Sequence, residues 1–439
     1  MTLSKTQTVL EARGLTKTFV NPDGKVHTVL DNIDFSLLEG EIVALLGRSG
    51  CGKSTLLRTL IGLIPPSAGE VRYRGRILDG PAPDMAMIFQ SFALFPWLTI
   101  QGNVELGLEA QHVPGAERRR RALEMIDLIG LDGFESAFPK ELSGGMRQRV
   151  GFARALVTNP EVLFMDEPFS ALDVLTAENL RGDLLELWTE KRISTKCILM
   201  VTHNIEEAVG LADRIVVLAP NPGRVRAEIL VSLPHPRDRD DPAFRELVEK
   251  VYTIMTTPPP SLEVNAPTGD RSSIAYRLPA APMGRLMGLL ERVAQEDYGK
   301  DDLPRISAEM HLDVDDLFPL TDAAELLGFA RVSHGDITLL PSGNALVEAD
   351  TVRRKTIFAE HLLARVPLER HIVSVLETHP ERRAPEERFL RELEDFMPPE
   401  DAQRLLSTAI DWGRYAEVFE YDFNSGIFAL EERGTAAPM

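Results

Sequence analysis

The stretch "GRSGCGKST", Gly47 to Thr55, decides which fold we expect for this chain. It fits the pattern G-x-x-x-x-G-K-[ST], and it stands between the apolar run "EIVALLG" and the helical pattern "GKSTLLRTLIGL". Its three glycines let the backbone bend tightly, so that the N–H groups of the loop and the start of the helix face phosphate groups. An ordinary glycine-rich turn could match the pattern by chance, but the strand before it and the helix after it favour a nucleotide-phosphate site.

This loop supplies the first candidate binding residues. We expect Lys53 to reach the β- and γ-phosphates and the hydroxyl of Ser54 to bind Mg²⁺. We interpret Cys51 as a small residue of the loop rather than a redox sensor. The predicted phosphate-binding residues are Gly47, Arg48, Ser49, Gly50, Cys51, Gly52, Lys53, Ser54 and Thr55.

Two further apolar runs end in side chains that suit phosphate chemistry. The run "EVLFMDEP" ends in Asp166 and Glu167, and the run "ILMVTH" ends in His203. Strands of a parallel sheet present such ends at the edge where ligands bind. Asp166 is suited to hold Mg²⁺, Glu167 to orient and deprotonate a water, and His203 to contact the γ-phosphate. Each of these three assignments would be weak by itself, but the phosphate loop earlier in the chain makes all three more convincing.

The alternation of short apolar runs with helical patterns predicts an α/β domain with a largely parallel sheet over residues 1–232. Many of the 30 prolines then fall in residues 233–283, which we interpret as a linker that contains one helical segment, "FRELVEKVYTIM". Residues 284–439 show three helical patterns followed by a β-hairpin, twice over. This order predicts a mostly helical, winged-helix-like C-terminal domain, with hairpin turns at Gly-Asp in "FARVSHGDITLL" and Asn-Ser-Gly in "FEYDFNSGIFAL".

Composition narrows the class of protein. The 439 residues include 48 Lys and Arg against 67 Asp and Glu, a net charge of −19, which argues against a general nucleic-acid surface. Two cysteines exclude a disulfide framework and suit a reducing compartment. The start "MTLSKTQTVLEARG" lacks the features of a signal peptide, and no apolar run approaches the roughly 18 residues of a spanning helix. We therefore expect a partner to bring this protein to any membrane it meets.

The segment "LSGGMRQR", Leu142 to Arg149, suggests the family. Together with the phosphate loop, Gln90, "MDEP", "SALD" and His203 in this order, it resembles the ATP-binding cassette (ABC) ATPases over residues 9–231. The resemblance implies a P-loop NTPase fold of the ABC type with a helical subdomain. It also implies ATP and Mg²⁺ as cofactors, and two cassettes that sandwich two nucleotides. The segments "LFPWLTIQGNVELGL" and "THNIEEAVGLADRIVVLAPNPGRV" are similar to the ATPases of nitrate, sulfonate and taurine importers, and the tail resembles their ATPase-associated C-terminal domain.

The resemblance assigns further site residues. It implies that Phe19 stacks on adenine and that Gln90 contacts Mg²⁺ and the attacking water. Asp173 would belong to a loop that communicates across the dimer. The signature residues Ser143, Gly144 and Gly145 would close over the ATP of a second subunit, because the amides at this helix start form an anion site.

One apolar run, "QSFALFPWLT" from Gln90 to Thr99, is unexpected in so acidic a chain. In the related ATPases this segment receives a short helix of the membrane subunit. We therefore expect permease contacts near Phe92, Phe95 and Trp97, since an apolar, aromatic patch suits such an interface. The alternative is that these residues are core of the helical subdomain; Pro96 and the following "TIQGN" favour a surface turn.

Two functions remain open at this stage. The first is an ATPase subunit that energises an importer of small anions or organic acids. It would lie at the cytoplasmic face of the inner membrane, as a homodimer on separate transmembrane subunits served by a solute-binding protein. The second is a soluble ABC ATPase that acts on nucleic acid or a regulatory complex. Residues 271–439 carry 19 basic and 31 acidic residues, a net charge of −12, so we expect no nucleic-acid partner. For the C-terminal domain, regulation and a passive dimer brace are equally open.

Overall fold

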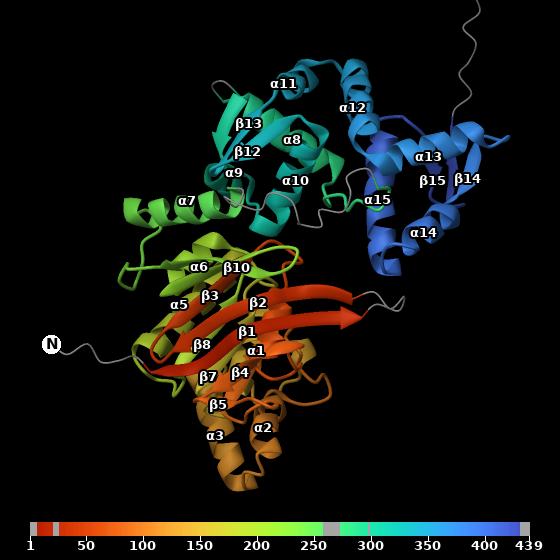
Figure 1. Cartoon of the computed structure of the whole chain (residues 1–439). Helices are drawn as coiled ribbons and strands as arrows, with labels where there is room; N and C mark the ends of the chain where they lie inside the picture. Colours follow the sequence, from red (N-terminus) through yellow and green to blue (C-terminus); the bar gives the residue numbers. More distant parts are fainter. Residues whose placement is uncertain (1–6, 21–25, 258–272, 297–298, 431–439) are drawn as a thin grey trace, which may run out of the picture. The chain divides into compact units, whose positions relative to one another are not determined.

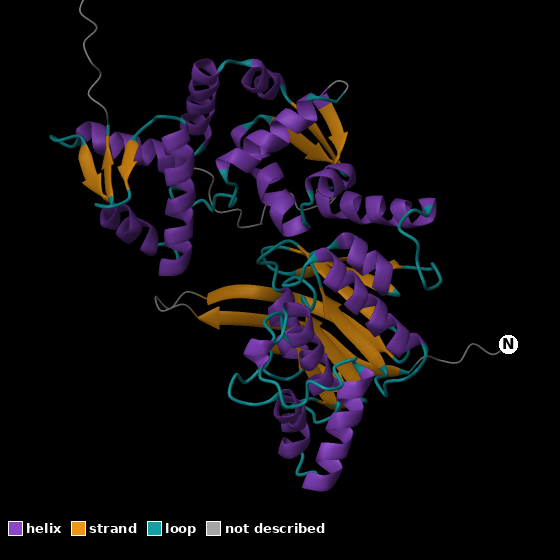
Figure 2. Ribbon diagram, turned by 180° about the vertical axis from the view of Figure 1, so that it is seen from behind, coloured by secondary structure: helices purple, strands orange, loops and turns teal. Residues whose placement is uncertain are grey.

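The structure is a computed structural model that describes residues 7–20, 26–257, 273–296 and 299–430. The first residues of the N-terminal segment and the proline-rich residues 258–272 of the expected linker lie outside the described residues. The described chain divides into two compact units, Met1–Val248 and Glu249–Met439, which we treat separately. Figures 1 and 2 show the helices and strands of both.

The N-terminal unit contains two sheets. The strands are β1 (Thr8–Val20), β2 (Val26–Leu38), β3 (Ile42–Gly47), β4 (Ala68–Tyr73), β5 (Arg76–Ile77), β6 (Met85–Ile88), β7 (Val162–Asp166), β8 (Cys197–Val201), β9 (Arg214–Ala219) and β10 (Arg224–Leu230). One sheet is antiparallel with the order β2-β1-β4-β5. The other has the order β10-β9-β3-β8-β7-β6, in which only β10 is antiparallel to its neighbour. The prediction of a largely parallel sheet is therefore confirmed for this second sheet.

The helices of this unit are α1 (Lys53–Leu60), α2 (Ile100–Ala110), α3 (Gly115–Leu128), the 3₁₀ turn η1 (Pro139–Glu141), α4 (Gly144–Leu156), α5 (Val174–Thr189) and α6 (Ile205–Leu211). Strands β3, β7 and β8 are buried at every position, which matches their continuous apolar sequences. A separate apolar cluster joins α2, α3 and α4 through residues such as Val104, Ile126 and Val150. This cluster is the core of a helical subdomain.

The second unit takes in the later part of α7 (Pro242–Thr256). Its other elements are α8 (Met283–Ala294), β11 (Lys300–Asp302), α9 (Leu303–Met310), α10 (Val314–Leu327), β12 (Ala330–Ser333), β13 (Asp336–Leu339), α11 (Pro341–Glu348), α12 (Thr351–Arg365), α13 (Pro367–Thr378), β14 (Arg383–Pro385), α14 (Glu386–Glu394), α15 (Pro399–Tyr415), β15 (Glu420–Asp422) and β16 (Ile427–Ala429). The order helix, strand, two helices, two strands occurs twice. It produces two three-stranded sheets, β11-β13-β12 and β14-β16-β15.

The sequence therefore predicted the repeated helices and hairpins but not the third strand of each sheet. The first hairpin also turns one residue earlier than expected. Ser333 pairs with Asp336, so the turn consists of His334 and Gly335, both with positive φ (55° and 89°), and Asp336 begins β13. Two central residues with positive φ define the tight turn that matches strand twist. The second hairpin closes through Asp422 and Gly426, whose N–H donates to the Asp422 carbonyl at 2.8 Å.

Among the residues that the structure describes, no helix is both long enough and apolar enough to cross a membrane.

Candidate functional site

The phosphate loop lies where sequence reasoning placed it, between β3 and α1. Gly52 is the N-cap of α1 and has φ 94°, a conformation that side chains other than glycine rarely adopt. A Cβ at this position would lie 2.7 Å from Leu30 Cδ2. The helix therefore begins with exposed N–H groups at its first turn, as an anion site requires.

Lys53 lies within this loop and is 6% exposed. Its Nζ donates hydrogen bonds to the carbonyl oxygens of Gly47 (2.7 Å) and Arg48 (3.4 Å). These two carbonyls border the concave side of the loop. The ammonium is thus held inside the loop and can exchange a backbone carbonyl for a phosphate oxygen with a small rotation of its stem.

Ser54 and Asp166, chosen from motifs 112 residues apart, lie in contact. The Ser54 hydroxyl donates to Asp166 Oδ1 at 3.2 Å. Asp166 ends β7 and is 7% exposed, and burial raises the pKa of its carboxyl despite the hydrogen bond from Ser54. A buried carboxylate beside a hydroxyl is a pair of hard oxygen donors, the kind that Mg²⁺ prefers. A nearby cation would relieve the cost of burying this charge.

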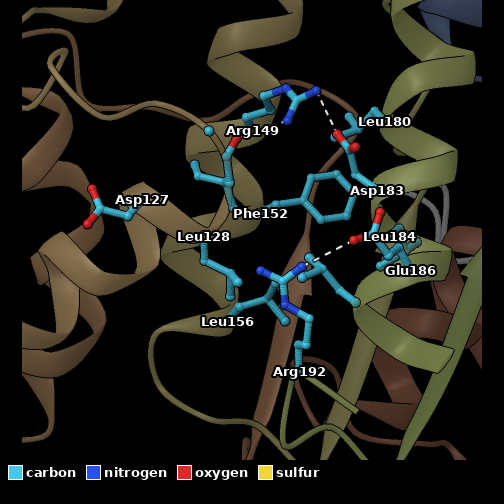
Figure 3. Close-up of a pocket in the computed structure, with 13 residues that line it drawn as sticks. Asp127, Leu128, Arg149, Phe152, Leu156, Leu180, Asp183, Leu184, Glu186 and Arg192 are labelled. Carbon is cyan, nitrogen blue, oxygen red and sulfur yellow. Dashed lines mark hydrogen bonds and ion pairs between the residues drawn. The ribbon is translucent and has the colours of Figure 1, made fainter. Parts of the chain in front are cut away.

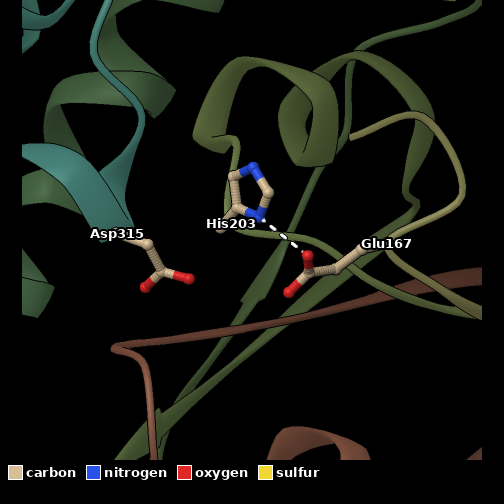
Figure 4. A group of neighbouring side chains, drawn as sticks. All are labelled: Glu167, His203 and Asp315. Carbon is tan, nitrogen blue, oxygen red and sulfur yellow. Dashed lines mark ion pairs between the residues drawn. The ribbon is translucent and has the colours of Figure 1, made fainter. Parts of the chain in front are cut away.

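Glu167 lies at the centre of a second group. Gln90 Nε2 donates to Glu167 Oε2 at 2.9 Å, and His203 Nδ1 lies 3.2 Å from the same oxygen (Figure 4). Glu167 has φ 48°, in the left-handed region that residues other than glycine seldom occupy outside functional sites. The ends of β6, β7 and β8 therefore bring three predicted side chains together, with Gln90 and His203 next to one carboxylate oxygen of Glu167.

The signature residues form the start of α4. Ser143 is its N-cap, and its hydroxyl accepts a hydrogen bond from the Met146 N–H at 3.3 Å. A Cβ on Gly145 would lie 2.2 Å from Thr176 Cγ2, so glycine is needed for α4 to approach α5.

Asp173 and Phe19 also lie apart from the two groups described above. Asp173 caps α5 and accepts a hydrogen bond from the Thr176 N–H at 3.1 Å; bonds from Thr176 lower the pKa of this carboxyl. Phe19, near the end of β1, is 42% exposed, and Lys17 Nζ lies 5.1 Å from its ring centroid. An aromatic face that is open to solvent can stack on a planar ligand.

The apolar run after Gln90 is exposed rather than core. Phe95 is 41% and Trp97 is 69% exposed, and their rings meet edge to face at 5.3 Å between centroids. Phe92 is partly buried, with the Arg147 guanidinium 5.2 Å from its ring centroid. The alternative that these residues are subdomain core is therefore not favoured for Phe95 and Trp97.

Sequence reasoning missed the residue that shapes this run. Asn103 on α2 is fully buried, its Oδ1 accepts from the Phe95 N–H at 2.8 Å, and its Nδ2 donates to the Phe95, Leu98 and Thr99 carbonyls at 3.0–3.2 Å. Both the donors and the acceptors of the Asn103 amide are thereby used. An asparagine inside a helical pattern, four residues after an N-cap threonine, was the available signal.

A cavity of about 230 Å³ lies elsewhere in the N-terminal unit, among α3, α4 and α5 (Figure 3). Phe152, Leu156 and Leu180 line it, and Arg149 forms an ion pair with Asp183 at 2.6 Å across its rim. None of the predicted site residues lines this cavity.

A phosphate loop, a buried Ser-Asp pair and a glutamate held by glutamine and histidine define an ATP-hydrolysing cassette of the P-loop class. Comparison with known proteins agrees. The sequence profile of the ABC transporter family matches residues 30–170, and that of the C-terminal AAA-associated domain matches residues 304–422. The chain belongs to the ATP-binding subunits of ABC transporters; it is an ATP hydrolase that energises transport.

Its relatives align over about half of this chain. An uncharacterized ABC transporter ATP-binding protein of Methanocaldococcus jannaschii is 43% identical over 246 residues, which are 56% of this chain and 91% of that protein. The nitrate import ATP-binding protein NrtD of Synechocystis is 45% identical over 51% of this chain and 83% of its own length. The taurine import ATP-binding protein TauB of Rhizobium johnstonii is 43% identical, and the match covers 53% of this chain and 90% of that protein.

Among solved structures, the ATP-binding cassette MJ0796 bound to ADP and Pi, described as a dimer, is similar to this chain. It is 34% identical with a TM-score of 0.46, and the match covers 51% of this chain and all of that one.

Proposed function

We propose that this chain is the ATPase subunit of an importer for small anions or organic acids of the nitrate, sulfonate and taurine type. The names of its relatives support the solute class, since import ATP-binding proteins for nitrate, taurine and aliphatic sulfonates are 41–45% identical to it. In this proposal it acts at the cytoplasmic face of the membrane, on separate transmembrane subunits. A solute-binding protein delivers the solute to these subunits. The exposed, edge-to-face pair of Phe95 and Trp97 supports a permease contact on the cassette itself.

The observation that carries the catalytic part is the convergence of Gln90 and His203 on Glu167. In the proposed reaction Glu167 accepts the proton of the attacking water, Gln90 orients that water, and His203 contacts the γ-phosphate. With Gln90 and His203 both next to one carboxylate oxygen, the other oxygen of Glu167 would remain for the water, which is the geometry a general base needs. Lys53 and the loop amides bind the phosphates and withdraw charge from the leaving group.

The proposed metal site consists of Ser54, Asp166 and Gln90. When bound, Mg²⁺ would neutralise phosphate charge and align the nucleotide. Asp166 would hold it as an anion, since a bound cation lowers the pKa that burial raises. Phe19 would stack on the adenine.

The proposed active form is a dimer, most simply of two copies of this chain. The support is that Ser143, Gly144 and Gly145 form the start of α4, which gives the chain a second helix start suited to an anion. In a dimer these amides would meet the nucleotide bound to the partner cassette, with Asp173 beside them. Neither group could enclose ATP alone.

The test of the proposal is the Glu167→Gln variant in the assembled transporter. We expect phosphate release to fall about 10²–10⁴-fold while ATP binding persists, because only the proton acceptor is lost. Glu190→Gln, an exposed change after α5, is the matched control and should leave the rate unchanged. Full turnover in Glu167→Gln would refute the assigned base.

Import is tested separately, in vesicles that contain the permease and the binding protein. We expect taurine or nitrate uptake to require ATP and an intact Lys53. ATP hydrolysis that no solute of this class stimulates would refute the solute assignment while leaving the ATPase activity established.

A further inference from the structure

The second repeat of the C-terminal unit contains a broad cavity of about 1,070 Å³. Its walls come from α12, α13, the end of α15 and the sheet β14-β16-β15, all within residues 363–430. One part of the lining is apolar, with Leu363, Val373, Phe419 and Ile427. None of the residues assigned to ATP lies here, so the cavity has no part in the site described above.

Three arginines line the same cavity: Arg382, Arg383 and Arg414. The Arg414 guanidinium lies 4.8 Å from the ring centroid of Phe423. Among the described residues, no ion pair or hydrogen bond engages the guanidinium of Arg382 or Arg383. This gathering of cations is unusual in the acidic segment 271–439, whose net charge is −12.

Four carboxylates line the cavity beside the three arginines. Glu417 is held by Lys355 at 2.5 Å. Asp422 accepts hydrogen bonds from the Ser425 hydroxyl (2.6 Å) and the Asn424 N–H (2.9 Å), which lower the pKa of its carboxyl. Two carboxylates remain in the lining, Glu377 and Glu420. The cavity thus offers groups of both charges beside an apolar wall, and among the described residues the guanidinium groups of Arg382 and Arg383 and the carboxylates of Glu377 and Glu420 have no ion pair.

The backbone that carries the arginines is fixed. Arg382 has φ 51°, its N–H donates to the His379 carbonyl at 2.9 Å, and its carbonyl accepts from the Leu430 N–H at 3.1 Å. Arg383 is paired with Ala429 in the sheet. Such a platform loses little conformational freedom when a ligand binds, and residues in the left-handed region recur at ligand sites.

We propose that this cavity binds an organic anion with a sulfonate or carboxylate head and a short apolar body. Guanidinium groups match the planar faces of these heads with paired hydrogen bonds, and the apolar wall would cover the body. Glu377 and Glu420 would accept an ammonium group on an amino-sulfonate. The volume suits a small organic ligand rather than a bare three-oxygen anion.

The binding itself is independent of the proposed transport function. Its biological sense rests on that function: the C-terminal unit would sense the organic anion that the transporter imports. An importer that binds its own solute inside the cell can adjust its transport rate to the internal concentration of that solute.

The test is calorimetric titration of the full chain carrying Lys53→Ala, so that the phosphate loop does not compete for the anion. The probes are 1-butanesulfonate, taurine and nitrate, each alone. We expect both sulfonates to bind and nitrate to bind at least tenfold more weakly. Arg382→Gln and Arg383→Gln should each weaken sulfonate binding about tenfold or more, since each removes a charge-assisted contact. Arg370→Gln, an exposed arginine on α13, is the matched control and should leave binding unchanged.

The proposal is overturned if neither sulfonate binds, or if both arginine variants bind them as tightly as the parent chain. It is also overturned if a DNA duplex binds in place of the sulfonates and the same variants abolish that binding. Circular dichroism of each variant verifies folding. Failure here leaves the ATPase test on Glu167 unaffected, and failure of import leaves the sulfonate titration interpretable.

Discussion

A glutamate without any hydrogen-bond partner lies at the centre of the second repeat. Glu369, in the first turn of α13, is fully buried, and neither carboxyl oxygen has a partner within the described residues. A Cβ on Gly413 would lie 2.9 Å from Glu369 Oε2 and even closer to the ring of Phe419. Burial alone raises the pKa of this carboxyl well above its ordinary value of 4.5. The buried environment of the folded chain therefore favours the protonated form of Glu369.

This buried acid makes the stability of the C-terminal unit depend on pH. Below pH 4.5 the folded and unfolded states both carry the proton, so nothing is lost. Above it the unfolded state ionises while the folded state does not, and the free energy of unfolding falls by about 1.4 kcal/mol per pH unit until the folded pKa is reached. We expect Glu369→Gln to abolish this part of the slope above pH 4.5.

Chemical denaturation would measure this slope through Trp412, which is buried in the same unit, in a chain with Trp97→Phe and Trp188→Phe. Glu360→Gln, an exposed glutamate on α12, is the control and should keep the parent slope. Equal slopes in the parent and in Glu369→Gln would show that the carboxyl finds a partner in solution.

At this scale the motifs predicted which side chains would meet. Ser54 with Asp166, and Gln90 with Glu167 and His203, are within hydrogen-bonding distance, as the common edge of a parallel sheet requires. Glu369 could not be predicted. Its burial follows from tertiary packing of α13 against α15, which a local sequence pattern does not encode.

Among the elements, the turn from Phe95 to Thr99 shows how polar anchoring can expose apolar side chains. Asn103 binds the turn from beneath, and the Arg154 guanidinium donates to the carbonyls of Ala93 (2.5 Å) and Phe92 (3.3 Å). The backbone is thereby held while Phe95 and Trp97 remain at the surface. Because the backbone is held, the exposed pair of Phe95 and Trp97 loses little conformational entropy when it binds a partner.

We expect Trp97→Glu to weaken binding to the permease by about 30-fold or more, because a charge would enter the proposed apolar contact. ATP affinity of the isolated chain should not change, since the side chain is mostly solvent-exposed. Co-purification with the permease and nucleotide titration measure the two quantities. Ile77→Glu, another exposed apolar residue, is the control. Loss of ATP binding in Trp97→Glu would contradict the proposed permease contact and support the alternative that Trp97 belongs to the core of the subdomain.

The variant Asn103→Leu tests the hydrogen bonds that hold the turn, instead of the exposed aromatic side chains. It leaves several buried carbonyls and one N–H without partners, so we expect the free energy of unfolding to fall by about 3 kcal/mol. The permease affinity should fall with it, although Trp97 is unchanged. Retained permease affinity in a destabilised chain would show that the turn keeps its shape without Asn103.

The elements also mark where local patterns stop being informative. Helices α9 and α13 are two of the helical patterns that the sequence showed, and proline and acidic residues mark their starts. Strands β11 and β14 have three residues each and no alternation of their own; they exist because a hairpin beside them offers an unpaired edge. Such strands are determined by their neighbours, so no window of sequence could have predicted them.

For the whole molecule, α7 decides where the chain can be divided. Its later turns belong to the C-terminal unit: the rings of Tyr252 and Phe318 meet at 6.3 Å, and the Gly335 N–H donates to the Thr256 hydroxyl at 2.8 Å. Tyr252 and Met255 are buried. A chain cut after α7 would expose this apolar face, whereas a cut before α7 removes only residues 242–248 of this helix from the N-terminal unit, so we place the cut before it.

We therefore expect a chain ending at Asp240, assembled with the same permease, to keep its basal ATPase rate within about twofold, because every assigned ATP-site residue precedes the cut. If the C-terminal unit senses an organic anion, internal taurine should change the ATPase rate of the full chain and leave that of the shortened chain unchanged. Phosphate release at a series of internal taurine concentrations measures both. If the unit is a passive brace, taurine changes neither rate, and the shortened chain loses activity on dilution as its dimer dissociates. The two roles thus predict opposite dependences, one on taurine and the other on protein concentration.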